Sequence, residues 1–171
     1  MLLQRHLQVL ALGLLSAGMM GLASCQPANP TPPLIQPGPA TDPAGTDVAI
    51  ELPEGDAERG GLIAQARGCT ACHITGAPKI GPAWESALNP DGLNSPGIAA
   101  KRLESPDYHG AAETVEQYIF ESIVSPNTDI VPPTDGANWV IAGPSTMLTE
   151  YGTLLSKKDV ADIIAYLKTL K

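Results

Sequence analysis

The chain has 171 residues, a formal net charge of −8 at pH 7, and 43% hydrophobic but only 4% aromatic residues. The acidic balance, without a basic run or an aromatic ladder, argues against nucleic acid as a partner. Few aromatic side chains also leave little large apolar material for a core, so we expect another group to help fill it.

The first 24 residues have the pattern of an export signal. Arg5 gives a positive start, and residues 7–22 form an apolar stretch without a charge. This stretch is at the short end of the roughly 17–25 residues that span a membrane. It ends in Leu-Ala-Ser-Cys, which resembles a bacterial lipoprotein signal and implies that Cys25 is lipidated and becomes the first residue after cleavage. A plain cleaved signal and an uncleaved anchor helix are the alternatives, and all three place the rest of the chain outside the cytoplasm.

Residues 25–54 follow as a proline-rich tether. Prolines recur from Pro27 to Pro43 and leave little room for helices or sheet ladders. A semi-extended, polyproline-like segment with a reach of about 3 Å per residue fits this composition. The sequence therefore predicts a leash between a lipid anchor at Cys25 and a domain over residues 55–171.

The domain is predicted to be all-α, because no stretch alternates as a strand would. We expect a first helix capped by Asp56 that runs toward Cys69. Residues 114–124 place apolar side chains on one helical face and predict a second helix. Between the helices, Gly- and Pro-rich stretches over residues 76–97 and 125–144 predict long loops.

The last helix carries the clearest signals. Ser156 and Asp159 form a capping box at its start. Apolar residues then repeat at helical spacing from Val160 to Leu170.

The stretch GCTACH, residues 68–73, carries the chemistry. A disulfide between Cys69 and Cys72 would close a very small loop and stabilise little, and a thioredoxin-type pair would need a strand–helix context that is absent here. A zinc site needs about four ligands, but beyond Cys25 only His109 remains as a further ligand of this kind.

The spacing C-x-x-C-H is instead typical of c-type haem attachment. Residues i and i+3 share one face of a helix, so Cys69 and Cys72 can both reach one edge of a porphyrin. His73 is adjacent and can turn beneath the ring to bind the iron. A covalent haem would also supply the apolar surface that the composition lacks.

Two side chains compete as sixth ligand of the iron. Met147 is the only methionine beyond the export signal, and His109 is the only spare histidine. A methionine alone is more often core filler, and an open or water-bound position is the third possibility.

From residue 55 to its end, about two-thirds of the sequence, the chain resembles class I monohaem cytochromes c. The resemblance rests on CTACH (69–73), IGPAW (80–84), VEQYIFESIVSPN (115–127) and MLTEYGTLLSKKDVADIIAYLKTL (147–170). It implies a small fold of a few helices wrapped around one covalent haem c, with long loops. It also implies that Met147 is the second axial ligand. Leu148 departs from the family, in which a proline often follows this methionine.

The same resemblance implies roles for four further positions. The carbonyl of Pro82 would accept a hydrogen bond from His73 and fix its orientation. Arg102 would lie near the haem propionates, with a plain surface charge as the alternative. Trp84 and Trp139 would flank the haem, with ordinary core packing as the alternative.

The resemblance also accounts for two glycines in the first helix. Gly60 and Gly61 should each cost that helix about 1 kcal/mol relative to alanine. In the family the first and last helices cross closely, which implies that Tyr166 meets a glycine. Helix fraying is the alternative explanation.

These features predict a carrier of single electrons rather than an enzyme, since no catalytic motif is visible. An iron held by His73 and Met147 would be suited to that role. A haem sensor or haem enzyme with a labile sixth ligand is one alternative, and a structural lipoprotein with a redox-silent CxxC pair is another.

The tether and the resemblance suggest a bacterial respiratory or photosynthetic chain. The domain would work at the outer, periplasmic face of the cell membrane, as a subunit of a membrane complex or as its donor or acceptor. A quinol-oxidising alternative complex III, with this chain as its monohaem cytochrome subunit, and a terminal oxidase are the two candidates. Removing residues 1–24 takes away Arg5 and no acid, so the remaining charge is about −9, which predicts a basic docking patch on a diffusing partner.

Overall fold

The computed structural model describes residues 39–73, 81–89, 91–133 and 143–171. All of these residues belong to one compact unit, residues 34–171. The described helices are α1 (Ala57–Ala66), α2 (Cys69–His73), the 3-10 helix η1 (Ser86–Leu88), α3 (Ser95–Leu103), α4 (Val115–Val124), α5 (Tyr151–Leu154) and α6 (Lys157–Leu167). The described residues contain no β-strand, and Pro43 and Ser156 form an isolated β-bridge. The predicted all-α class is confirmed.

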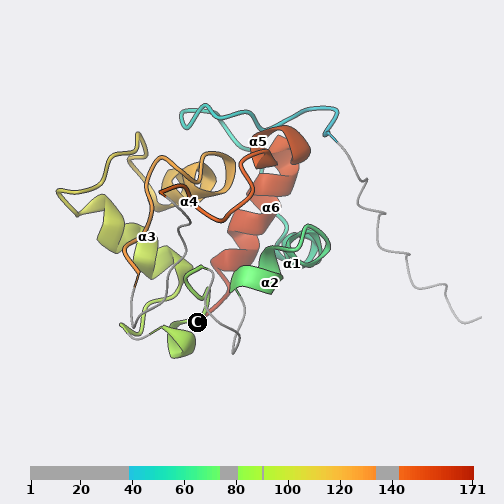
Figure 1. The fold of residues 1–171 in the computed structure, drawn as a ribbon. Coiled ribbons are helices and arrows are strands. Elements are labelled where there is room, and N and C mark those ends of the chain that lie inside the picture. Colours follow the sequence, from blue (N-terminus) through green and yellow to red (C-terminus); the bar gives the residue numbers. More distant parts are fainter. Residues whose placement is uncertain (1–38, 74–80, 90, 134–142) are drawn as a thin grey trace, which may run out of the picture. The chain divides into compact units, whose positions relative to one another are not determined.

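Helix α1 crosses α6 at close range (Figure 1). The crossing depends on Gly60, because a Cβ on this residue would collide with the backbone carbonyl of Asp162. The next residue, Gly61, lies against the ring of Tyr166, where a Cβ would be 3.2 Å from Cε2. The close crossing and the glycine–tyrosine contact that the resemblance implies are both present.

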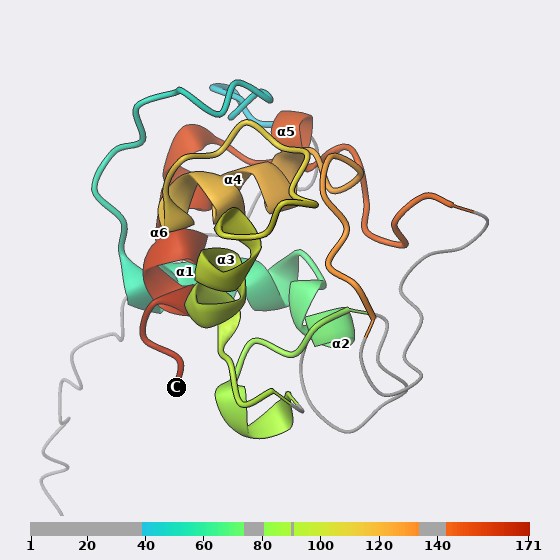
Figure 2. The same cartoon turned by 90° about the vertical axis from the view of Figure 1, so that its left-hand side faces the viewer.

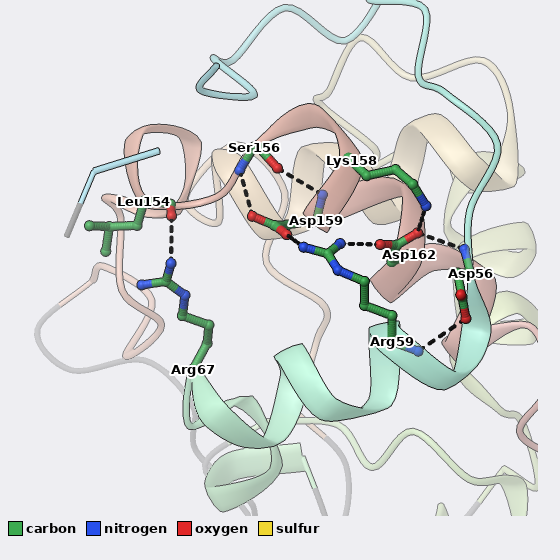
Figure 3. Close-up of polar contacts among 8 residues, drawn as sticks. All are labelled: Asp56, Arg59, Arg67, Leu154, Ser156, Lys158, Asp159 and Asp162. Carbon is green, nitrogen blue, oxygen red and sulfur yellow. Dashed lines mark hydrogen bonds and ion pairs between the residues drawn. The ribbon is translucent and has the colours of Figure 1, made fainter. Parts of the chain in front are cut away.

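Charged side chains hold the start of α1 against α6 (Figure 3). The buried carboxylate of Asp162 is 0% exposed and accepts hydrogen bonds from the side chains of Arg59 and Lys158 and from the backbone N–H of Asp56, the last at 2.6 Å. The other arm of the Arg59 guanidinium donates to Asp159 at 2.5 Å. A buried carboxylate is tolerated only when it is paired in this way, so the network fixes how the two helices meet.

The capping residues that the sequence predicts are in place. Asp56 accepts from the N–H of Arg59 at 3.1 Å and begins α1. Ser156 and Asp159 form the reciprocal capping box of α6. A second capping box, Thr114 with Gln117, begins α4.

Helix α4 is buried on almost all sides, since it packs against α6 and against α3 (Figure 2). Its core side chains are Tyr118, Ile119, Phe120, Ile123 and Val124. The neighbouring helix α3 is not expected from the sequence, which predicts a loop as far as residue 97. The side chain of Asn94 caps it by accepting from the N–H of Gly97 at 3.0 Å, and Pro96 lies in its first turn, both of which favour a helix start.

Residues 40–52, which we call the N-terminal strap, lie on the domain although the predicted tether extends to residue 54. Backbone hydrogen bonds run from the N–H groups of Ala40, Ala44 and Gly45 to carbonyls in the segment 152–155. Ala44 is 1% exposed and belongs to the hydrophobic core. Residues 40–52 of the predicted leash are therefore held against the folded domain.

Within the described residues, no helix combines the length and the apolar character needed to cross a membrane.

Candidate metal and cofactor site

The motif of two cysteines and a histidine forms the short helix α2, directly after α1. Cys69, Cys72 and His73 all lie in this single stretch of helix, and both thiols are free. Because Cys69 and Cys72 are three residues apart in a helix, they share one face. Cys69 is half-buried and Cys72 exposed, so the pair lies at an edge of the domain rather than in its interior.

A cavity of about 320 Å³ opens beside α2. Its walls come from segments far apart in the sequence, and most of the side chains on them are apolar. They include Ile119 and Ile123 of α4, Ile163 and Leu167 of α6, and Met147 from the loop before α5. The cavity is thus a mostly apolar space between α4, α6 and the loop before α5, and the three residues of the motif also line it.

His73 is held in one orientation by a hydrogen bond and by a ring contact. Its Nδ1 donates to the carbonyl oxygen of Pro82 at 2.8 Å, the bond that the resemblance implies. Its ring also stacks on Trp84, with centroids 5.1 Å apart and planes within 8° of parallel. Since Nδ1 carries the proton, Nε2 keeps its lone pair and is available to a metal.

Burial is the main influence on the protonation of His73 and of Cys69. Burial lowers the pKa of His73 and outweighs the opposing effect of the Pro82 carbonyl, so the neutral imidazole is favoured. Burial raises the pKa of the Cys69 thiol, although a hydrogen bond with Tyr151 acts in the opposite direction. Tyr151 lines the same cavity, and its hydroxyl donates to the carbonyl of Arg67 at 3.1 Å.

Trp84 connects the histidine to the helix crossing. It is 8% exposed and lines the cavity. Its ring meets Tyr166 edge-on, with centroids 6.2 Å apart at 82°, and Tyr166 in turn rests on Gly61. Trp84 therefore belongs both to the cavity wall and to the core packing.

The structure separates the two candidate sixth ligands. Met147 is half-buried, packs against the hydrophobic core and lies on the cavity wall. Its N–H donates to the hydroxyl of Ser145 at 3.1 Å. His109 is exposed and is not among the residues that line the cavity. Leu148, where the family often has proline, also borders the cavity and is 47% exposed.

Arg102 is neither on the surface nor on the cavity wall. It is 9% exposed, and its guanidinium donates to both carboxylate oxygens of Asp129, at 2.6 and 3.0 Å. The hydroxyl of Tyr118 donates to the same carboxylate at 2.9 Å. Hydrogen bonding to Asp129 raises the pKa of Arg102, so the guanidinium stays charged. Asp129 and Tyr118 do line the cavity, and the sequence analysis missed both.

Two predicted site residues, Cys25 and Trp139, lie outside the described residues. Within the described ranges, no group of three or more His, Cys, Asp or Glu side chains is placed to hold a metal ion.

A covalent haem fits the residues that surround the cavity. Two free thiols share one helical face, an oriented imidazole has an unprotonated Nε2, and an apolar space lies between this motif and Met147. His and Met are a known pair of axial ligands for a c-type haem.

Comparisons with known proteins give one match. The family model described as Cytochrome c matches residues 57–171. A comparison with curated proteins found no match, and neither did one with solved structures.

Proposed function

The chain belongs to the cytochrome c family, and from this premise we propose that it is a membrane-anchored cytochrome that carries single electrons in a bacterial respiratory or photosynthetic chain. Family membership confirms the class I cytochrome c fold, covalent haem c as the cofactor, and electron transfer as the general activity. The pair Cys69 and Cys72 fits the attachment site of such a haem. The axial ligands, the anchor and the partners are the parts that we propose.

The observation that carries the proposal is that His73 and Met147 line one apolar cavity. When bound there, haem c supplies an iron that alternates between Fe(II) and Fe(III). His73 would present Nε2 to it from the turn fixed by Pro82, and Met147 would present its sulfur from the loop before α5. The apolar side chains of α4 and α6 on the cavity wall would exclude water from the iron. This arrangement favours electron transfer over gas sensing or peroxide chemistry.

The charged groups near the cavity are compatible with this role. Among the described residues that line the cavity, Asp129 is the acidic one, and its charge is matched by Arg102. A paired carboxylate adds little net charge to the cavity, and a low net charge near an iron favours its reduced state.

Replacement of Met147 by alanine in the holoprotein tests the ligand assignment. We expect the visible spectrum to change, the reduction potential to fall, and carbon monoxide to bind the reduced protein rapidly, because axial methionine raises the potential and occupies the sixth position. His109→Ala is the matched control and should leave all three unchanged. Rapid, complete binding of carbon monoxide by the unmodified protein would instead support a sensor or an enzyme.

For the membrane attachment, we propose lipidation at Cys25. The sequence 22–25 supports it, as does the apolar stretch before it. Cys25→Ser should release the cytochrome from membranes if the signal is still cleaved. A variant that stays membrane-bound at an unchanged, uncleaved mass would indicate an anchor helix instead.

The partner that we propose is a membrane complex, either a quinol-oxidising alternative complex III or a terminal oxidase. The acidic charge of the chain supports a basic docking surface if the domain diffuses to its partner. Electron-transfer rates should then fall steeply with added salt. A fixed subunit would copurify with its complex in mild detergent and show little salt dependence.

A further inference from the structure

Three backbone donors of the N-terminal strap bond to one short part of the domain. The N–H of Ala40 donates to the carbonyl of Thr153 at 3.0 Å, that of Ala44 to Leu155 at 2.8 Å, and that of Gly45 to Gly152 at 2.8 Å. All three acceptors belong to α5 or to the residue after it. The strap therefore holds α5 from the outside.

Side-chain packing supports the same attachment. Ala44 is 1% exposed within the hydrophobic core. Val48, Ile50 and Leu52 follow at alternating positions, and each is half-buried against that core. The approach is so close that a Cβ on Gly152 would be 2.8 Å from the carbonyl oxygen of Gly45. In a loosely attached tether, the backbone N–H groups would bond to water and the apolar side chains would be exposed.

The inner side of the same segment faces the haem cavity. Tyr151 and Leu155 line the cavity together with Met147, which precedes α5 by only four residues. Leu155 is 0% exposed. Segment 151–155 thus has the strap on one side and the cavity on the other, and any displacement of α5 also displaces the loop with the methionine.

We propose that the N-terminal strap is a positioning element for Met147, bracing α5 so that the methionine loop stays closed over the haem cavity. The proposal rests on the proposed function, since it takes Met147 as an axial ligand. It extends the functional domain to about residue 40. A family match that begins at residue 57 does not include this segment.

The test compares two full-length holoproteins, Ala44→Gln and Ala49→Gln. Both are neutral substitutions in the same strap, but Ala44 is buried and Ala49 is exposed, so only the first should dislodge the strap. Amide hydrogen exchange at residues 44, 45 and 151–155 reports on the attachment. The combination of carbon monoxide with the reduced protein reports on the sixth position.

We expect Ala44→Gln to accelerate exchange at these amides and combination with carbon monoxide by about tenfold each, because a buried polar group without partners favours the dislodged state. Ala49→Gln should leave both rates unchanged. If Ala44→Gln does not yield a folded holoprotein, Ala44→Val beside Ala49→Val makes the same comparison with a smaller perturbation.

Two results would overturn the proposal. In one, residues 44 and 45 exchange as fast in the unmodified protein as in an unfolded chain. In the other, Ala44→Gln accelerates amide exchange but leaves the carbon monoxide rate unchanged, which would make the strap only a structural attachment. Failure of the proposed function is distinguishable from both, because it would appear as an unchanged spectrum in Met147→Ala whether or not the strap amides are protected.

Discussion

Two adjacent glycines allow the helix crossing to be tested with matched substitutions. Gly60→Ala and Gly61→Ala each gain about 1 kcal/mol of helix propensity. They differ in what the new methyl group meets. At Gly60 it collides with the backbone carbonyl of Asp162 and comes within 2.9 Å of the N–H nitrogen of Ile163, and backbone in the middle of α6 cannot swing aside. At Gly61 it meets the Tyr166 ring at 3.2 Å, and this half-buried side chain can shift by a few tenths of an ångström.

Forcing an extra group into a packed contact costs about 1–3 kcal/mol. Taking the upper end of that range for Gly60, less the gain in propensity, we expect Gly60→Ala to lower the free energy of unfolding by about 2 kcal/mol. Gly61→Ala should remain within about 1 kcal/mol of the unmodified protein. Urea unfolding of the oxidised holoprotein, followed by far-UV circular dichroism, measures both, and the melting temperature of Gly60→Ala should fall by about 4–8 °C. A Gly60→Ala protein as stable as Gly61→Ala would refute the close crossing of α1 and α6.

The remaining predictions concern charged groups. Asp129→Asn should lower the free energy of unfolding by about 3 kcal/mol, because it leaves the buried guanidinium of Arg102 without its carboxylate. Lys101→Ala, which removes an exposed ion pair, should change that free energy by less than about 0.5 kcal/mol. Equal effects of the two substitutions in urea unfolding would contradict this prediction. Burial alone would raise the pKa of Asp159, but hydrogen bonds from Ser156 and Arg59 outweigh it, and the pKa of the folded state lies below its ordinary value. Its contribution to stability is therefore complete above about pH 4 and is lost as the pH falls through the folded-state pKa. Asp159→Asn should cost about 1 kcal/mol near pH 7 and flatten the acid limb of the stability curve, and a limb as steep as that of the unmodified protein would argue against this linkage.

The parts of the fold that the sequence predicts correctly depend on neighbours in the chain. The cap at Asp56, the capping box at Ser156 and the helical turn of residues 69–73 all join groups three or four residues apart. Such contacts follow from residue type and spacing alone. Helix α3 also begins with a local signal, because Asn94 two residues before Pro96 is typical of a helix start. A proline next to a glycine, Pro96 and Gly97, is typical of a loop as well, and the sequence analysis interprets the segment that way.

The features that the sequence does not predict join distant residues. The backbone donors of the strap bond to carbonyls more than a hundred residues later in the chain. Main-chain hydrogen bonds do not depend on residue type, so the sequence does not indicate them. Its one local signal is the alternation of Val48, Ile50 and Leu52, which is typical of a segment with one buried side. The Arg102–Asp129 pair joins residues 27 positions apart, so residue type and spacing do not predict that this guanidinium is paired within the protein.

The strap also limits how far a lipid-anchored domain could move. If Cys25 is the anchor and the folded part begins at Ala40, a fully extended connection is at most about 50 Å long. With a leash that extends to Gly55, the limit would be about 100 Å. A span of half that length would keep a domain anchored at Cys25 closer to the membrane surface, which would favour a partner whose docking site is also close to that surface.

Substitutions at Gly60 and Gly61 should change different properties: the stability of the fold in the first case and the surroundings of His73 in the second. The atoms nearest to a Cβ on Gly60 are all backbone atoms of α6, so the effect of this substitution is on whether the two helices can approach. Gly61 begins a series of contacts that passes through the Tyr166 ring to Trp84 and from there to the stacked imidazole of His73. Packed aromatic rings transmit small displacements because the interior has few voids to absorb them. Gly61→Ala should therefore be nearly silent in unfolding experiments and yet shift the reduction potential, whereas the stability loss in Gly60→Ala needs no change at His73.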